Sequence, residues 1–285
     1  MNIFAKITGI KYTPLLCKRL HTYSIDELGE ALSKEATFLL KINENNLLSL
    51  SWWVSAKRTR SYPYARVYDS LGFAGKRVTI IPIFKDEGFE GDRDFLQWDT
   101  ISLMSLLGIY VIIAHYHSAT RSKRYRHKIT NQRFNVEDIK SEIGRLLSYQ
   151  SDPLHWNLKQ IEKVNEVGKK ALEAYSRISE KLGVKMHSYD LAKNRIEELF
   201  MDKDNFMKLS RELAEKAQKR ESVTVQPKEN VDGSKATITI KNYLGGHYFF
   251  TSDEVRIERD NIYLIDAKHT KGNKLPSIGD IKDGL

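Results

Sequence analysis

An amphipathic segment between Asp152 and Gly183 constrains the fold of this chain more than any other feature. Apolar residues recur there at helical spacing, while lysine and glutamate occupy most other positions. Asp152 precedes Pro153, a typical helix start, and Gly183 supplies a stop signal. A long helix with one apolar face must pack against another surface. We therefore interpret it as a helix that packs on the core or on a second subunit.

The sequence before this segment favours strands. Residues 1–133 mix short apolar runs with turn residues, and "SWWVSA", "YARVYDSLGF" and "KRVTIIPIF" are typical of strands. The stretch "QWDTISLMSLLGIYVIIAHY" predicts a helix capped by Asp99 and then a buried strand from Tyr110 to Ala114. Asn135, with Asp138 three residues later, predicts the start of a further helix.

Helices and then strands follow Gly183. Two shorter helices are expected near 189–201 and 205–219. A meander of antiparallel strands is expected next, with turns at 245–246 and 259–261. The pattern predicts an α/β (α+β) protein with three parts: a β-rich part (1–133), a central helical segment (134–201) and a C-terminal part (202–285).

Charge points to a polyanionic partner. Among 285 residues the formal net charge is +9, and a basic protein of this kind most often meets nucleic acid. The chain has no apolar run of about 18 residues, so no membrane partner is expected. Cys17 is the one cysteine, which excludes an internal disulfide framework. With no secretory signal in the first residues, we expect a cytoplasmic protein.

Two acids and a lysine frame a predicted hairpin near the end of the chain. Asp266 and Lys268 are two residues apart, so on one strand they share a face. Asp253 lies 13 residues before Asp266, which leaves room for two strands of about five residues and a short turn. Both carboxylates would converge at one end of the hairpin. Carboxylate pairs suit Mg²⁺, which keeps open positions for phosphate oxygens.

This arrangement resembles the PD-(D/E)XK nuclease superfamily, which includes type II restriction endonucleases. Asp253 takes the position of the first acid, Asp266 that of the second, and Lys268 that of the lysine. The resemblance implies a C-terminal restriction-endonuclease-like core, a mixed sheet flanked by helices. It also implies that both aspartates and the backbone carbonyl of Ala267 bind Mg²⁺, and that Lys268 orients or activates the attacking water.

The same resemblance extends to neighbouring residues. It implies that the basic segment after the lysine, with Lys271 and Lys274, lies near DNA. Many family members also recruit an acid from a preceding helix, for which Glu212 and Glu215 are candidates. We favour the alternative that these two glutamates pair with surface lysines at helical spacing.

Two basic clusters are candidate DNA-binding surfaces, because such clusters neutralise phosphates. Their alternative role is that of a generic basic surface. The first cluster consists of Lys57, Arg58 and Arg60, and the second of Arg121, Lys123, Arg124 and Arg126.

A second acidic cluster precedes the predicted strand at 110–114. Its members are Asp86, Glu87, Glu90, Asp92, Asp94 and Asp99, with His115 and His117 nearby. The spacing matches no calcium loop, and a third zinc ligand is not evident. We interpret the cluster as a polar loop, with a second metal site as the alternative.

The leading hypothesis is a Mg²⁺-dependent, site-specific endonuclease of restriction type that cuts double-stranded DNA. Cutting both strands of a symmetric site needs two active sites, so a homodimer is expected. The alternatives are a less specific nuclease of repair, recombination or defence, and a non-catalytic DNA-binding protein whose hairpin acids are incidental.

Overall fold

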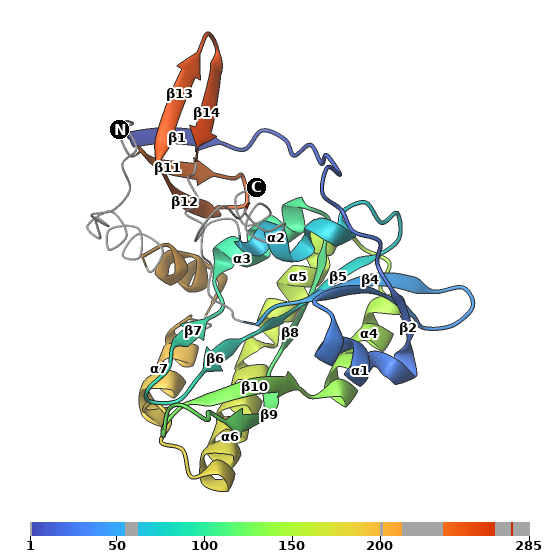
Figure 1. Cartoon of the computed structure of the whole chain (residues 1–285), viewed down its shortest axis with the longest axis vertical. Helices are drawn as coiled ribbons and strands as arrows, with labels where there is room; N and C mark the ends of the chain where they lie inside the picture. Colours follow the sequence, from blue (N-terminus) through green and yellow to red (C-terminus); the bar gives the residue numbers. More distant parts are fainter. Residues whose placement is uncertain (1, 55–61, 200–201, 213–235, 266–274, 276–285) are drawn as a thin grey trace.

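A five-stranded mixed sheet forms the centre of the protein (Figure 1). The computed structural model describes residues 2–54, 62–199, 202–212, 236–265 and 275. In sheet order the strands are β2 (Thr22–Ser24), β3 (Thr37–Lys41), β4 (Leu47–Trp52), β5 (Arg77–Pro82) and β8 (Tyr110–Ala114). Strands β4, β5 and β8 run parallel to one another, whereas β3 is antiparallel to β4 and parallel to β2.

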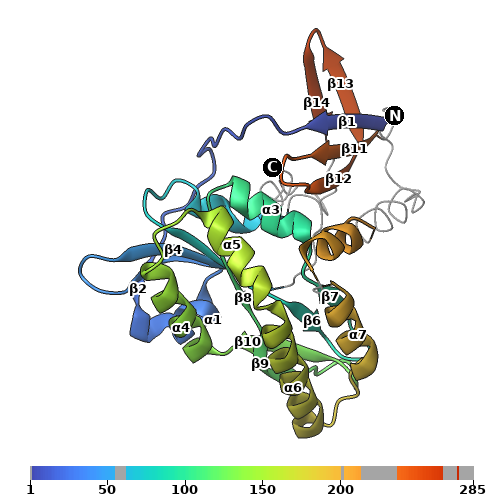
Figure 2. The same ribbon diagram turned by 180° about the vertical axis from the view of Figure 1, so that it is seen from behind.

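Helices cover both faces of this sheet (Figures 1 and 2). They are α1 (Leu28–Lys34), α2 (Tyr62–Val67), α3 (Trp98–Leu106), α4 (Val136–Leu147), α5 (Pro153–Glu162), α6 (Val164–Leu182) and α7 (Tyr189–Leu199), with a further helix over residues 203–212 and short 3-10 turns at Ile25–Glu27 and Tyr68–Ser70. Two hairpins extend the body: β6 (Phe84–Asp86) with β7 (Arg93–Phe95), and β9 (Tyr116–Arg121) with β10 (Ile129–Phe134).

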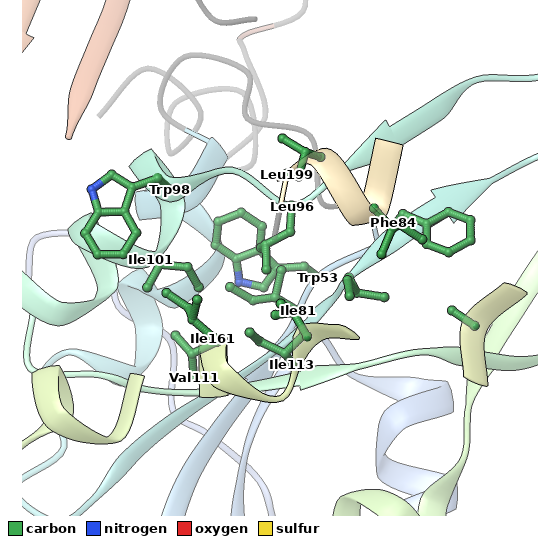
Figure 3. Close-up of a cluster of buried hydrophobic side chains, with 14 of the residues drawn as sticks. Trp53, Ile81, Phe84, Leu96, Trp98, Ile101, Val111, Ile113, Ile161 and Leu199 are labelled. Carbon is green, nitrogen blue, oxygen red and sulfur yellow. The ribbon is translucent and has the colours of Figure 1, made fainter. Parts of the chain in front are cut away.

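Burial on both sides explains the continuous apolar runs of the central strands. Successive side chains of a strand point to opposite faces. In β8, Val111 and Ile113 belong to one buried cluster and Ile112 to the other. Figure 3 shows the first cluster, in which Trp53, just after β4, lies among side chains of β5 and β8. A strand buried on both faces needs apolar residues at every position, as in other α/β sheets.

Helix α5 covers the open edge of this sheet at β8. The side-chain amide of Asn157 accepts a hydrogen bond from the Val111 amide at 2.7 Å, and that of Gln160 accepts from the Ile113 amide at 3.2 Å. The indole of Trp156 donates to the Val111 carbonyl at 2.7 Å. These bonds satisfy the edge groups that would otherwise be open to another strand.

A second sheet joins segments from the two ends of the described chain. Strand β1 (Asn2–Lys6) pairs in parallel with β11 (Ala236–Lys241), which pairs antiparallel with β12 (His247–Ser252). Beyond it projects the hairpin of β13 (Glu254–Glu258) and β14 (Asn261–Ile265). The blue strand β1 lies among the orange and red C-terminal strands in Figure 1.

The turn between β11 and β12 attaches this second sheet to α3. The indole of Trp98 donates to the Leu244 carbonyl at 3.0 Å, and the Asp99 carboxylate accepts from the His247 amide at 2.8 Å. From the helix at 203–212, Arg211 donates to the Gly245 carbonyl at 2.9 Å. Both the central body and the preceding helix therefore hold this turn.

The structure confirms the α/β class. Residues 1–133 contain nearly all strands of the body together with α1, α2 and α3, and residues 134–201 contain α4 to α7. The helix at 98–106 and the strand at 110–114 are confirmed, but the N-cap of that helix is Gln97, and Asp99, the predicted cap, lies within its first turn. The caps at Asn135 and Asp152 are confirmed, since Asn135 accepts from the Glu137 amide and Asp152 from the His155 amide. No helix in the described ranges is long and apolar enough to cross a membrane.

Two further predictions about individual elements are wrong. The stretch at 64–73 is not a strand, because its first part completes α2 and then forms a 3-10 turn. The long helix is interrupted at Lys163, which separates α5 from α6. The interruption lets α5 follow β8 while α6 packs along β9.

Candidate functional site

The base of the β13–β14 hairpin is fixed by Ser252. Strand β12 ends at this residue, Asp253 follows, and β13 begins at Glu254. The buried Ser252 hydroxyl lies 2.8 Å from the Glu254 carbonyl oxygen and 3.0 Å from that of Ile265, so its single proton is shared between the two strands. The backbone on either side of Asp253 is thereby tied to the end of β14.

The register of the hairpin agrees with the spacing argument. Each of its strands has five residues, Glu254 pairs with Ile265, and the turn follows Glu258. Arg259 reverses the chain with a φ of 53°, in the left-handed region. Two five-residue strands and a short turn were expected between the acids, and this part of the prediction is confirmed.

The second acid and the lysine adjoin this geometry in the chain. Asp266, Ala267 and Lys268 lie outside the described residues, as do Lys271 and Lys274. Asp253 directly precedes Glu254, and Asp266 directly follows Ile265, the partner of Glu254. Covalent geometry keeps adjacent Cα atoms about 3.8 Å apart. The described hairpin therefore begins directly after the first acid in the chain and ends directly before the second.

The candidate helix acids divide between described and undescribed residues. Glu212 is exposed at the end of the described helix at 203–212, and Glu215 lies outside the described ranges. The neighbouring Arg211 contacts the β11–β12 turn. This helix therefore packs on the same sheet from which the hairpin projects.

Of the two basic clusters, the structure describes only the second. Lys57, Arg58 and Arg60 lie outside the described residues. Arg121 ends β9, and Lys123, Arg124 and Arg126 are exposed in the loop that leads to β10. In both Figure 1 and Figure 2, β9 and β10 lie at the end of the molecule opposite β13 and β14.

The second acidic cluster is dispersed over separate interactions. Glu87 pairs with Lys85 and Lys128, and Asp99 accepts a hydrogen bond from β12. Glu90 accepts a hydrogen bond from the amide of His127. Within the described ranges, no three histidine, cysteine or acidic side chains are grouped to hold a metal ion. Members of the cluster also lie on separate elements, with Asp86 at the end of β6, Asp94 in β7 and Asp99 in α3.

His115, expected near these acids, is buried beneath α4. Its Nδ1 lies 3.9 Å from a carboxylate oxygen of Asp138, and its side chain is 8% exposed. Burial lowers the pKa of His115 below its usual value, partly opposed by Asp138. His117, two residues on, is exposed on β9. The two imidazoles therefore differ in environment.

The structure also brings together a pair that the sequence analysis missed. Asp86 at the end of β6 contacts His187, in the segment between α6 and α7, with 2.8 Å between Oδ1 and Nδ1. The residues are 101 positions apart in the chain, so no local spacing signals the contact. They line a cavity between β6 and α6.

Comparisons of the chain with protein-family profiles, with curated proteins and with solved structures found no match.

Proposed function

We propose that this protein is a Mg²⁺-dependent endonuclease that cleaves double-stranded DNA at specific sites. Asp253 and Asp266 would hold the metal together with the carbonyl oxygen of Ala267, and Lys268 would orient or activate the attacking water. The observation that supports the proposal is the pairing of Glu254 with Ile265, since the chain continues from this pair into both acids.

The donor set at the hairpin base suits the metal. Carboxylate and carbonyl oxygens are the protein ligands that Mg²⁺ prefers, and it usually keeps several water ligands for exchange with phosphate oxygens. When bound, the ion supplies Lewis-acid polarisation of the phosphodiester and lowers the pKa of a bound water. The chain's own contribution would be to keep both acids at one end of the hairpin, whose base Ser252 holds in place.

The charge of the protein fits a nucleic-acid substrate. A net charge of +9 favours association with phosphates. The exposed arginines and lysine of the β9–β10 loop lie far from the hairpin along the molecule. In the proposed homodimer, one protomer's loop would contact the duplex away from that protomer's own cleavage point.

Cleavage of a supercoiled plasmid in MgCl₂ tests the proposal. Asp253→Asn, Asp266→Asn and Lys268→Ala should each reduce the cleavage rate at least about 100-fold, because each removes a group in direct contact with the metal or the attacking water. Asp260→Asn is the matched control, since it removes the same charge at the turn of the same hairpin and should cleave at the wild-type rate.

The products separate the proposed function from its alternatives. Discrete fragments support site-specific cleavage, whereas a smear indicates a nuclease with little specificity. DNA binding without cleavage in the wild-type protein would indicate a non-catalytic binding protein. Cleavage that survives both Asp253→Asn and Asp266→Asn would show that the hairpin is not the active site.

A further inference from the structure

A cavity of about 320 Å³ lies in the central body, away from the β13–β14 hairpin. Strand β6, helix α6 and the segment leading into α7 form its walls. This volume is at the lower end of the range of ligand sites in proteins. The cavity is therefore large enough for a small organic molecule and too small for a nucleotide chain.

Aromatic and aliphatic groups form much of the wall. Phe84 and Tyr175 pack with 5.0 Å between ring centroids, and Met186 lines the cavity beside them. The Tyr175 hydroxyl donates to Gln132 Oε1 at 2.6 Å and accepts from the Asp86 amide at 3.0 Å. Because its proton is already committed, Tyr175 offers a ligand its ring and no hydrogen-bond donor.

Asp86 is the buried polar group of the cavity, with 3% of its surface exposed. Its Oδ1 accepts hydrogen bonds from the Gly88 amide at 2.8 Å and from His187 Nδ1 at 2.8 Å. Its second oxygen, Oδ2, accepts none from any residue that the structure describes. Oδ2 is not among the fully buried polar atoms that lack a partner, so it keeps contact with solvent where Asp86 lines the cavity. It can therefore accept a hydrogen bond from a donor that a ligand brings.

His187 adds a second acceptor next to Asp86. A carboxylate accepts hydrogen bonds, so the Nδ1 atom of His187 must carry the proton that it donates to Asp86. In the neutral imidazole the lone pair is then on Nε2. Within the described part of the chain, Nε2 has no hydrogen-bond partner, and the ring lines the cavity.

Two of the other polar residues at the wall, Ser176 and Ser179, have hydroxyls whose protons are already committed. The hydroxyls of Ser176 and Ser179 donate to the carbonyl oxygens of Leu172 and Val184. The ammonium group of Lys185 lies over the ring of Phe89, 4.5 Å from its centroid.

Glu180 contributes a further carboxylate at the wall. Together with Asp86 Oδ2 and His187 Nε2 it gives the cavity three acceptor positions, beside the N–H and O–H groups of Lys185 and Tyr189, which also line it.

We propose that this cavity binds a small planar ligand in which an aromatic body carries several N–H donors, such as an amidine or an aminoheterocycle. The aromatic body packs against the wall that Phe84, Tyr175 and Met186 form. Its N–H groups donate to Asp86 Oδ2 and His187 Nε2. A cationic amidine gains additional attraction from the carboxylates, because charge-assisted hydrogen bonds are the stronger ones.

Calorimetric titration of the full chain with two probes tests the site. Benzamidine carries the proposed donors and charge, and benzamide has nearly the same shape without the charge. Benzamidine should bind at least about tenfold more tightly than benzamide, in line with a charged hydrogen bond in place of a neutral one. Asp86→Asn should weaken benzamidine binding about tenfold or more and leave benzamide binding nearly unchanged.

Asp190→Asn is the matched control, since it removes an exposed acid in the first turn of α7 and should leave both affinities unchanged. If Asp86→Asn does not fold, as judged by circular dichroism, Ser176→Met provides a second test by filling the cavity from α6, and it should abolish binding of both probes. Equal affinity for the two probes, no binding of either at millimolar concentration, or benzamidine binding unaffected by Asp86→Asn or by Ser176→Met would overturn the proposal.

Discussion

Replacing Asn242 by alanine should release the second sheet from α3. The Asn242 Oδ1 atom accepts hydrogen bonds from the amides of Leu244 and Gly246, each at 2.9 Å. Its Nδ2 donates to the hydroxyl of Tyr248 at 2.6 Å and lies 3.2 Å from that of Ser102. One side chain thus shapes the β11–β12 turn and connects it to α3.

The expected cost follows from the groups left behind. A buried donor without a partner costs about 1–3 kcal/mol. The Gly246 amide is buried and that of Leu244 is half-buried, so together they should cost about 3 kcal/mol. The hydroxyls of Ser102 and Tyr248 still bond each other at 2.8 Å. Their loss of Asn242 therefore adds little.

The chain contains a matched control for this change. Asn43 Oδ1 likewise accepts from two backbone amides, those of Asn45 at 3.0 Å and Asn46 at 2.9 Å, but in an exposed loop. Water replaces the lost acceptor there, so Asn43→Ala should lower the free energy of unfolding by less than about 1 kcal/mol.

Two measurements compare the variants. Urea unfolding at unchanged m-value gives the global free energy, and hydrogen exchange of the β11 and β12 amides detects a sheet that opens by itself. Asn242→Ala should lower protection of these amides far more than Asn43→Ala does. Equal effects of the two substitutions in both measurements would refute the reasoning.

Two further predictions concern the central body. Burial lowers the pKa of His115 in the folded state. As the pH falls, the unfolded chain therefore binds a proton at this histidine before the folded chain does. The stability that neutral His115 contributes is fully present above the unfolded pKa of about 6.5, and it is lost as the pH falls through the folded-state pKa. His115→Gln should flatten the free energy of unfolding against pH in this window, and an unchanged slope would contradict the assignment. Gly183→Ala should lower the free energy of unfolding by about 1 kcal/mol, because Gly183 ends α6 at a φ of 59°. Gly144→Ala, at an exposed position of α4, should instead raise it by up to about 1 kcal/mol. Thermal unfolding measures both glycine variants, and melting temperatures that shift in the same direction would contradict this account.

Elements with local signals could be predicted from the sequence. Asn135 and Asp152 cap helices through bonds to amides two or three residues away, so their pattern is visible in the chain. The hairpin at 254–265 was predictable because two strands of fixed length and a turn determine a spacing. These features depend on few distant contacts.

Elements set by tertiary contacts could not be predicted in this way. Tyr64 and Tyr68 favour a strand by composition, yet they are four residues apart and pack edge to face on one side of a helical segment, at 5.6 Å between ring centroids. Tyr68 also packs against Tyr12, far away in the chain. Tertiary packing of these tyrosines therefore overrides their strand propensity.

The two candidate sites also differ in whether local sequence spacing reveals them. The acids of the hairpin are close in sequence, so a spacing argument reaches them. The contact between Asp86 and His187 depends on the path of α6 and of the segment that follows it, which no local pattern specifies.

The pairing of β1 with β11 also determines when the second sheet can form during synthesis. Asn2 pairs with Thr237, so the ribosome makes one strand of this pair long before the other. At about 5–20 residues per second, the delay is on the order of ten seconds or more. The central body has all its strands before β11 exists, so it can fold first. Among the described elements, the β13–β14 hairpin is therefore synthesised last, after every strand of the central body.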